Sequence, residues 1–404
     1  MAAPITATRK ISISPAEAYR AFSNSTLLRD WLCDAAEVEP RKGGRFYLWW
    51  STGAHAAGEY AAADPGKKIA IRWHHNREPE PTQVKVTFAA RKTGTLVTVR
   101  HDIGPGRKWA AAAKAARSAW EDALENLQSV LETGIDLRIM RLPRMGVFID
   151  NFNADIARDL GVPVQQGMRL AGVADGTGAQ AAGLQKDDVL VSLGGKKLTD
   201  FHSLGRALRA RTAGDKVAVV FYRGGRKTTV QMELSKRPAP EIPVTLDEFV
   251  ETVSKNYADL DAAWATLIEG VSDDEAARWP ALNEWSLKES VAHFILVERD
   301  TQSWFAQMVN DGEIGESLEF RTNVNARVRA VVEVYPTLAT LIDELKRSEQ
   351  ETVAMLRGLP AQFVARKHFF ARAAQWMLQV IPSHYHDEHL GLMQSAIRSA
   401  KQKG

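Results

Sequence analysis

The chain has 404 residues, a length that predicts two to four domains. Hydrophobic residues make up 45% and charged residues 25%, which is typical of a globular protein. The net charge of +3 is spread along the whole length, so the composition indicates no nucleic-acid partner.

A single cysteine, Cys33, excludes an intramolecular disulfide and a cysteine-rich zinc site. No apolar run approaches the roughly 18 residues that a membrane-spanning helix needs. Residues 1–14 lack the apolar core of a signal peptide. We therefore expect a cytoplasmic protein without a membrane partner.

The first 135 residues begin with a strand at 5–13, where polar and apolar residues alternate. Ser14-Pro15-Ala16-Glu17 then has the pattern of a capped helix start, with proline at the first helical position. Further strands are expected at 45–50, 58–62, 68–74, 83–89 and 95–101. Apolar residues spaced by three or four predict a long helix from Trp109 to Leu131.

This order of elements resembles the START-like superfamily, in the branch related to the activator of the heat-shock-protein ATPase. The residues that carry the resemblance are Ser14 to Glu17, Leu28 to Trp31, Arg41 to Phe46, Gly58-Glu59, Ile69 to Trp73, Gly94-Thr95, Trp120, Leu124 and Leu127.

The resemblance implies a helix-grip α+β domain over residues 1–135. In that fold a curved sheet wraps the long helix and can enclose a cavity for a hydrophobic small ligand. The domain would alternatively contact an unfolded or chaperone-related partner. The candidate lining residues of the cavity are Trp31, Phe46, Trp49, Trp73, Trp109 and Trp120. The other interpretation is that these aromatic side chains fill an ordinary core.

The most specific string in the chain is GAQAAGLQKDDVLVSLGG, at residues 178–195. Its Ala182-Gly183-Leu184, the acidic pair that follows, and the strand that ends in a Gly-Gly turn resemble a PDZ domain of the bacterial, protease-associated type. The resemblance implies a β-barrel-like PDZ domain over residues 140–237. Asp187 stands where glycine is usual, and aspartate tolerates a left-handed backbone better than most residues.

A PDZ domain binds an extended peptide or a protein C-terminus by adding it as a strand to its sheet. The candidate peptide-binding residues are Met145, Gly146, Val147 and Phe148 in the place of the carboxylate-binding loop, with Leu204 and Leu208 on a short helix. A hairpin is expected across Gly224-Gly225, where two glycines favour a type I′ turn. The alternative interpretation is a PDZ-like spacer that binds no peptide.

A proline-rich linker at residues 236–243 separates this segment from a region of long helices. Helices are expected at 245–269, 286–310, 335–356 and 371–401, with a further helix before residue 335. Pro382 would kink or restart the last one. Together they predict a four-helix bundle over residues 244–404.

Two strings in this region, at residues 283–293 and 384–392, resemble motifs of the DinB-like family. There, one histidine of the second helix and a pair on the last helix bind a divalent metal. The resemblance implies His293, His386 and His389 as ligands, and three histidines with an open position suit zinc or nickel.

On an α-helical wheel, His386 and His389 are about 60° apart, whereas His384 and His389 are about 140° apart. The runner-up set replaces His386 by His384. Glu298 and Asp387 are candidates to orient the ligand histidines by hydrogen bonds. The alternative is a vestigial site whose histidines are satisfied by hydrogen bonds in the core.

We therefore expect a multidomain α+β and all-α chain that acts as a binding or adaptor protein. Its bundle would hold one metal ion or form the face of a homodimer. The contrasting hypothesis is a metal-dependent transferase or hydrolase centred on the histidines, and the pattern assigns no catalytic acid or base. A third class, stress-linked sensing, would rest on a small ligand of the first domain.

Overall fold

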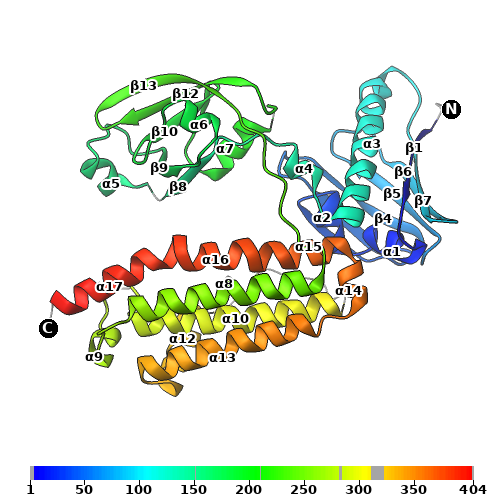
Figure 1. Ribbon diagram of the computed structural model, residues 1–404. Helices are drawn as coiled ribbons and strands as arrows, with labels where there is room; N and C mark the ends of the chain where they lie inside the picture. The colour runs from blue at the N-terminus through cyan, green and yellow to red at the C-terminus, as the bar shows by residue number, and fades with distance from the viewer. Residues whose placement is uncertain (1–3, 151, 210, 282–283, 311–322, 403–404) are drawn as a thin grey trace. The chain divides into compact units, whose positions relative to one another are not determined.

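The computed structural model describes residues 4–150, 152–209, 211–281, 284–310 and 323–402. They form two compact units, and each is described by itself. The first unit combines Met1–Ile135 with Glu241–Gly404, and the second is Asp136–Pro240. The PDZ-like segment is therefore inserted, in sequence, between two parts of one unit (Figure 1).

The N-terminal part of the first unit is a seven-stranded antiparallel sheet with the order β1-β7-β6-β5-β4-β3-β2. The strands are β1 (Ile5–Ile11), β2 (Ala35–Val38), β3 (Arg45–Trp49), β4 (His55–Asp64), β5 (Lys68–His75), β6 (Thr82–Arg91) and β7 (Gly94–Asp102). The helices are α1 (Pro15–Ala21), α2 (Ser25–Trp31) and the long α3 (Ala110–Thr133), which follows a short 3-10 turn at Arg107–Trp109.

The predicted helix start at Ser14 is confirmed. The Ser14 side chain accepts a hydrogen bond from the Glu17 backbone, and the Glu17 carboxylate accepts one from Ser14, which completes a capping box. Helix α3 buries Trp120, Leu124 and Leu127 in the same cluster as the inward side chains of the sheet. This amphipathic packing gives the helix-grip arrangement that the sequence predicts.

The end of α3 lies against α15 (Lys367–Gln375), a helix of the C-terminal part of the same unit. Gly134 follows α3 with φ 77°, and a Cβ added there would lie 2.3 Å from the Ala371 Cβ. Asp30 and Arg372 form an ion pair beside this contact. These contacts explain why the first and last segments of the chain form one unit.

The second unit is a PDZ-type sheet with the strand order β13-β12-β10-β9-β8 and a short strand, β11, beside β10. Its strands are β8 (Val147–Asp150), β9 (Met168–Val173), β10 (Val189–Leu193), β11 (Lys196–Lys197), β12 (Lys216–Arg223) and β13 (Arg226–Glu233). Its helices are α4 (Leu137–Met140), α5 (Ala154–Asp159), α6 (Gly178–Ala181) and α7 (Phe201–Leu208).

Two turns of this unit test the sequence analysis. Asp187 has φ 69°, the left-handed conformation expected at the position where glycine is usual. The β12–β13 hairpin is confirmed, but the predicted type I′ turn is wrong: Gly224 has a positive φ of 55° and Gly225 does not. A positive φ at the first central residue alone is the pattern of a type II′ turn, which also suits strand twist.

The C-terminal part of the first unit is a bundle of long helices. They are α8 (Leu246–Leu267), α10 (Leu287–Val309), α12 (Val324–Val334) and α13 (Leu338–Arg357), with the short helices α9 (Asp273–Ala277) and α14 (Ala361–Ala365). The last rod of the bundle joins α15, α16 (Ile381–Ser383) and α17 (Leu390–Gln402) through two π-helical segments, Trp376–Val380 and His384–His389.

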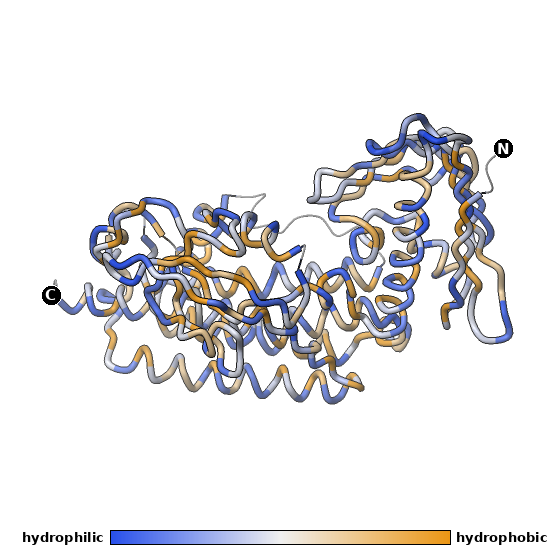
Figure 2. The backbone as a smooth tube through the Cα atoms, turned by 90° about the horizontal axis from the view of Figure 1, so that it is seen from above, coloured by the Kyte–Doolittle hydropathy of each residue, from blue (hydrophilic) through white to orange (hydrophobic). Residues whose placement is uncertain are grey.

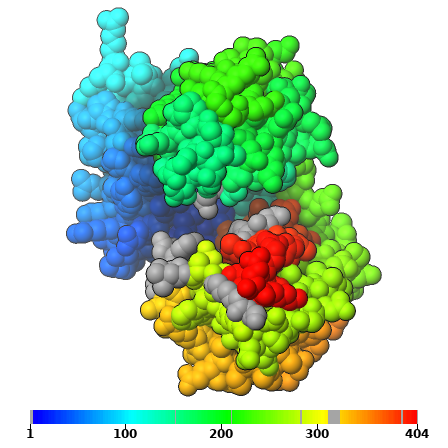
Figure 3. All heavy atoms as spheres, turned by 90° about the vertical axis from the view of Figure 1, so that its left-hand side faces the viewer, coloured from blue at the N-terminus to red at the C-terminus, as the bar shows by residue number. Residues whose placement is uncertain are grey.

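Hydrophobic and hydrophilic residues alternate along the bundle helices, as the orange and blue segments in Figure 2 show. The apolar residues meet in one buried cluster that includes Phe249, Phe294, Phe305 and Phe370. Helix α17 packs against α9 and α10 and lies on the bundle surface, red in Figure 3. None of the described helices is long and apolar enough to cross a membrane.

Candidate metal centre and peptide groove

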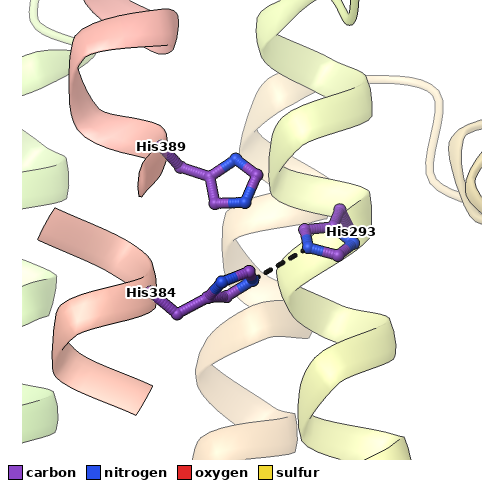
Figure 4. Close-up of side chains that lie close together, drawn as sticks. All are labelled: His293, His384 and His389. Carbon is purple, nitrogen blue, oxygen red and sulfur yellow. Dashed lines mark hydrogen bonds between the residues drawn. The ribbon is translucent and has the colours of Figure 1, made fainter. Parts of the chain in front are cut away.

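Two elements of the bundle present the histidines of the DinB-like motifs. Helix α10 begins at the cap Ser286, where a capping box with Glu289 fixes its first turn. Seven residues beyond the cap, His293 is 2% exposed and faces the interior. His384 and His389 lie at the two ends of the second π-helical segment (Figure 4).

The structure brings His293, His384 and His389 together. One ring nitrogen from each residue lies within 4.8 Å of the others. The Nε2 atoms of His293 and His384 are 3.0 Å apart, at hydrogen-bond distance. The ring of His389 is centred 5.1 Å from that of His293 and 4.5 Å from that of His384. Three imidazoles from two helical elements therefore converge on one point.

The donor set fits a divalent metal ion of the zinc or nickel type, because such ions are commonly held by imidazole nitrogens. Two nitrogens on a tetrahedral zinc ion are about 3.3 Å apart, close to the observed Nε2 separation. Burial, and then the charges of nearby His389 and His384, lower the pKa of His293 to about 3. His293 is therefore neutral at physiological pH, and the neutral imidazole is the form that binds a metal.

His386, the first choice of the sequence analysis, does not join this group. Its side chain is exposed, whereas His384, the runner-up, points toward His293. The wheel argument assumed about 100° per residue, but the backbone here is π-helical, with hydrogen bonds from residue i to i+5. Residues five apart then lie nearly above one another, which places His384 and His389 on one face.

Trp285 is a neighbour of the histidines that the sequence analysis did not single out. Its ring is centred 4.9 Å from His293 and stacks on His389 at 6.4 Å. The indole Nε1 donates to Asn325 on α12, which holds the ring in place. The DinB-like string at residues 283–293 already contains Trp285, which immediately precedes the cap Ser286.

Of the two proposed supporting carboxylates, the structure describes the side chain of Glu298. Glu298 accepts hydrogen bonds from Tyr257 and Thr352, and no described hydrogen bond joins it to the histidines. The side chain of Asp387 lies outside the described residues. Phe294 is a further aromatic neighbour of the histidines, with its ring 5.1 Å from that of His389.

The predicted peptide-binding residues fall into two groups. Val147 on β8 and Leu204 on α7 are partly buried against the PDZ core, and Phe148 is 59% exposed. Met145 and Leu208 are buried, so their side chains belong to the core. Phe201, at the start of α7, is 69% exposed and was not singled out from the sequence. A single aromatic residue at the start of a helix forms no sequence pattern that would predict its exposure.

Two features of the same unit suit strand addition. Strand β8 is at the edge of the sheet, so one side of its backbone has no neighbouring strand. Gly146, just before it, has φ 86°, and a Cβ there would lie within 2.4 Å of three side-chain atoms of Thr177. Only glycine fits this position of the loop.

The aromatic residues proposed to line a cavity of the first domain pack tightly. The Trp31 indole donates to the Ala21 carbonyl, Phe46 stacks on Trp73, and the Trp73 ring is centred 5.9 Å from that of Trp120. Trp109 is 3% exposed, and Trp49 is partly buried at the end of β3. These contacts are those of a core, and a ligand cavity at this place stays a prediction.

Comparison with protein families finds three matches in chain order. Residues 12–132 match the Activator of Hsp90 ATPase homolog 1-like protein family, residues 143–234 the PDZ domain, and residues 253–393 the DinB superfamily. The chain therefore consists of a START-like part, a PDZ part and a DinB-like part, as the resemblances of the sequence imply.

Curated relatives match only part of the chain. The periplasmic pH-dependent serine endoprotease DegQ of Escherichia coli is 30% identical over 100 residues, or 25% of this chain and 22% of that protein. A probable periplasmic serine protease do/HhoA-like of Haemophilus influenzae is 28% identical over 108 residues, 27% of this chain and 22% of its own length. The chain thus covers about a fifth of these relatives.

Two of the similar solved structures each match about a third of the chain. An HSP90 activator from Plasmodium falciparum is 23% identical and covers 32% of this chain and 95% of its own, with a TM-score of 0.29. The Aha1 dimer from Colwellia psychrerythraea is 18% identical and covers 32% and 96%, with a TM-score of 0.30. At these scores the likeness carries no argument about function.

Proposed function

We propose that the DinB-like part binds one divalent metal ion, zinc or nickel, through His293, His384 and His389. The observation that carries the proposal is the convergence of three ring nitrogens within 4.8 Å. Three nitrogen ligands leave one position of a tetrahedral ion open to water or to another small ligand. A bound ion of this kind lowers the pKa of a coordinated water or thiol.

The PDZ part is proposed to bind an extended peptide or a protein C-terminus. Support comes from the free edge of β8 and from the glycine-only loop at Gly146. Val147, Leu204, Phe148 and Phe201 offer apolar surface on the two elements that would flank such a peptide. The match gives no ground for assigning the relatives' protease activity to this chain, because it covers only about a fifth of their length.

The whole chain is proposed to act as a multidomain binding or adaptor protein in the cytoplasm. The START-like part would bind a hydrophobic small ligand or a chaperone-related partner, and its match to the Activator of Hsp90 ATPase homolog 1-like protein family supports this idea. A homodimer through the bundle stays a proposal as well.

A second candidate function is a metal-dependent transferase or hydrolase. The observation that favours it is the open coordination position that three histidines would leave, because structural metal sites usually fill all four positions with protein ligands. The residues that bind and orient a substrate are not defined by the described side chains around the histidines.

The deciding experiment is the metal content of the purified full-length protein by elemental mass spectrometry, after zinc or nickel loading. About one ion per chain is expected in the natural protein and in His386→Ala, and far less in His293→Ala and His384→Ala. Since His386 is exposed on the same π-helical segment, His386→Ala is the matched control. Equal metal loss in His386→Ala and His384→Ala would contradict the proposed ligand set, and no metal in the natural protein would contradict the site itself.

A further inference from the structure

A second polar cluster lies inside the bundle and takes no part in the proposed metal site. It consists of Glu298 on α10, Glu349 and Thr352 on α13, Tyr257 on α8 and Tyr385 on the second π-helical segment. Each of these side chains is no more than 5% exposed. Buried carboxyl groups are rare without a partner of opposite charge, so the cluster needs an explanation.

Hydrogen bonds satisfy only half of the Glu298 carboxyl group. Its Oε2 accepts from the Tyr257 hydroxyl at 2.8 Å and from the Thr352 hydroxyl at 2.7 Å. Gln302 donates to the Thr352 oxygen, and the single Thr352 proton is shared between Glu298 at 2.7 Å and the Ser348 carbonyl at 3.1 Å. Oε1 of Glu298, Oε1 of Glu349 and the Tyr385 hydroxyl are buried and have no hydrogen-bond partner.

Within the described ranges, neither Glu298 nor Glu349 forms an ion pair with lysine or arginine. Lys346 on α13, which lowers the pKa of Glu349, pairs with Asp261 on α8 at 3.8 Å, and its side chain is 41% exposed. Glu349 lies one helical turn before Thr352, which donates to Glu298, so two ionised carboxylates would share one buried region of low dielectric constant.

Electrostatics disfavours that doubly ionised state. Burial, and then the charge of Glu298, raise the pKa of Glu349 to about 9, with Asp261 raising it and Lys346 lowering it. Burial raises the pKa of Glu298 to about 7, against the lowering effect of the Thr352 and Tyr257 hydrogen bonds. Like charges that share one buried site bind a proton between them, and the proton belongs to the pair.

We propose that Glu298 and Glu349 form a buried site for one proton, carried at neutral pH by Glu349. A protonated carboxyl group is a hydrogen-bond donor. The Glu349 proton would then satisfy an oxygen of Glu298, directly or through a buried water, and Glu298 would remain the acceptor for Tyr257 and Thr352. One proton thus removes the excess charge and supplies the missing donor.

The proposal makes the bundle sensitive to alkaline pH. The folded state binds the proton more tightly than the unfolded chain, because the pKa of both carboxyl groups is raised on folding. The stabilisation is complete near and below the carboxyl pKa of the unfolded chain, and it is lost as the pH rises through the carboxyl pKa values of the folded state. The tyrosines that face the pair, Tyr257 and Tyr385, keep their protons in this range because burial raises their pKa.

The proton site does not depend on a metal ion. Neither glutamate is within two residues of the histidines or shares a described contact with them. Phe294 contacts both the polar cluster and the histidines, with its ring 4.1 Å from that of Tyr385 and 5.1 Å from that of His389. Its side chain has no group that could transfer a proton between them. Failure of the metal proposal would therefore leave this inference standing.

Infrared difference spectroscopy of the full-length, metal-free protein between about pH 7 and pH 10 tests the site. The carbonyl band of one protonated carboxyl group per chain is expected at pH 7, and it should disappear with an apparent pKa above 7. At about pH 8, above the pKa of Glu298, the same band should be missing from Glu349→Gln and present in Glu351→Gln, an exposed glutamate on the same helix. Absence of the band from the natural protein would overturn the proposal, whether or not the variants fold.

Thermal unfolding across the same pH range gives the second readout. The natural protein should lose several degrees of melting temperature more than Glu349→Gln, because the neutral amide keeps a donor without a titrating charge. An equal alkaline loss in Glu349→Gln would contradict the proton site. Stabilisation by sodium, potassium, magnesium or calcium ions that disappears in Glu349→Gln would show a bound cation instead, and would also overturn it.

Discussion

His384 and His389 are five residues apart in the chain, and their imidazole rings are centred only 4.5 Å from each other. In an α-helix, two side chains at this spacing would point about 140° apart. The segment between them is wound as a π-helix, which brings both rings to the side of His293. Single π-helical turns are rare overall, but those that occur are often found at functional sites. The winding of the backbone is therefore itself part of the site.

Pro382 is expected to maintain this winding. It lies between the two π-helical segments and cannot donate the backbone hydrogen bond of a regular α-helix. Pro382→Ala should let the rod rewind toward an α-helix, turn His384 away from His389 and weaken zinc binding by tenfold or more, an effect typical of groups that orient metal ligands.

Competition titration against a chromophoric chelator measures the zinc affinity of Pro382→Ala, with circular dichroism to confirm that the helix content is kept. Pro360→Ala, at the cap of α14, is a proline variant outside the rod and should bind zinc like the natural protein. An unchanged affinity in Pro382→Ala would show that other contacts hold the π-helical turn.

The sequence predicts the elements of each domain well because their patterns are local. The capping box at Ser14, the left-handed Asp187 and the stripes of the bundle helices each follow from a few neighbouring residues. The three family resemblances also hold, in the predicted order along the chain. Features of this kind need no knowledge of distant contacts.

What the sequence could not predict depends on the geometry of distant parts. A helical wheel at about 100° per residue argues against His384 as a ligand beside His389. No local sequence pattern predicts that the backbone becomes π-helical there. Glu298 and Glu349 are 51 residues apart and look like ordinary polar positions of two helices, yet both are buried in one cluster. Their meeting follows from the order in which the helices pack.

His101 should make the START-like part sensitive to acid. Burial lowers its pKa to about 4, and its ring nitrogens are engaged by the Trp120 indole at 3.3 Å and the Thr82 hydroxyl at 2.8 Å. Below a pH of about 6.5 the unfolded chain takes up a proton that the folded state rejects, so stability is lost from there toward pH 4. We expect a loss of about 1–3 kcal/mol, reduced by Glu78, which lies 3.7 Å from the ring and whose raised pKa opposes the effect.

Urea unfolding followed by tryptophan fluorescence between pH 7.5 and pH 5 checks this slope. His101→Gln cannot take up a proton and should flatten it, whereas His74→Gln, at an exposed position on strand β5 of the same sheet, should leave it unchanged. A slope that is the same in all three proteins would assign the acid sensitivity to other groups.

Asp187 should tolerate glycine better than alanine. Its φ of 69° strains any side chain with a Cβ, and its carboxylate accepts from Arg169 at 2.6 Å. Asp187→Ala and Asp187→Gly both remove the carboxylate, so their difference isolates the backbone effect. We expect the PDZ part of the glycine variant to be more stable by about 1 kcal/mol in chemical unfolding. Equal stabilities would mean that the loop relaxes to a negative φ.

Gly146→Ala should abolish peptide binding by the PDZ part. Gly146 combines a φ of 86° with a close approach to Thr177, whose side-chain atoms would lie within 2.4 Å of an added Cβ. The loop before β8 must then shift, which would move the backbone that is proposed to receive the peptide carboxylate. Gly176→Ala is the matched control, since Gly176 also has a positive φ, 67°, but has no atom within 4 Å of its added Cβ.

Selection of C-terminal peptides from a library with the natural protein, followed by fluorescence titration of the best binder, supplies the probe. The control variant should lose about 1 kcal/mol of stability from backbone strain and keep most of its peptide affinity. The Gly146 variant should lose at least tenfold in affinity, because displaced backbone donors no longer meet the carboxylate. If both variants lost affinity equally, general destabilisation would explain the result, and the loop at Gly146 would have no special part in binding.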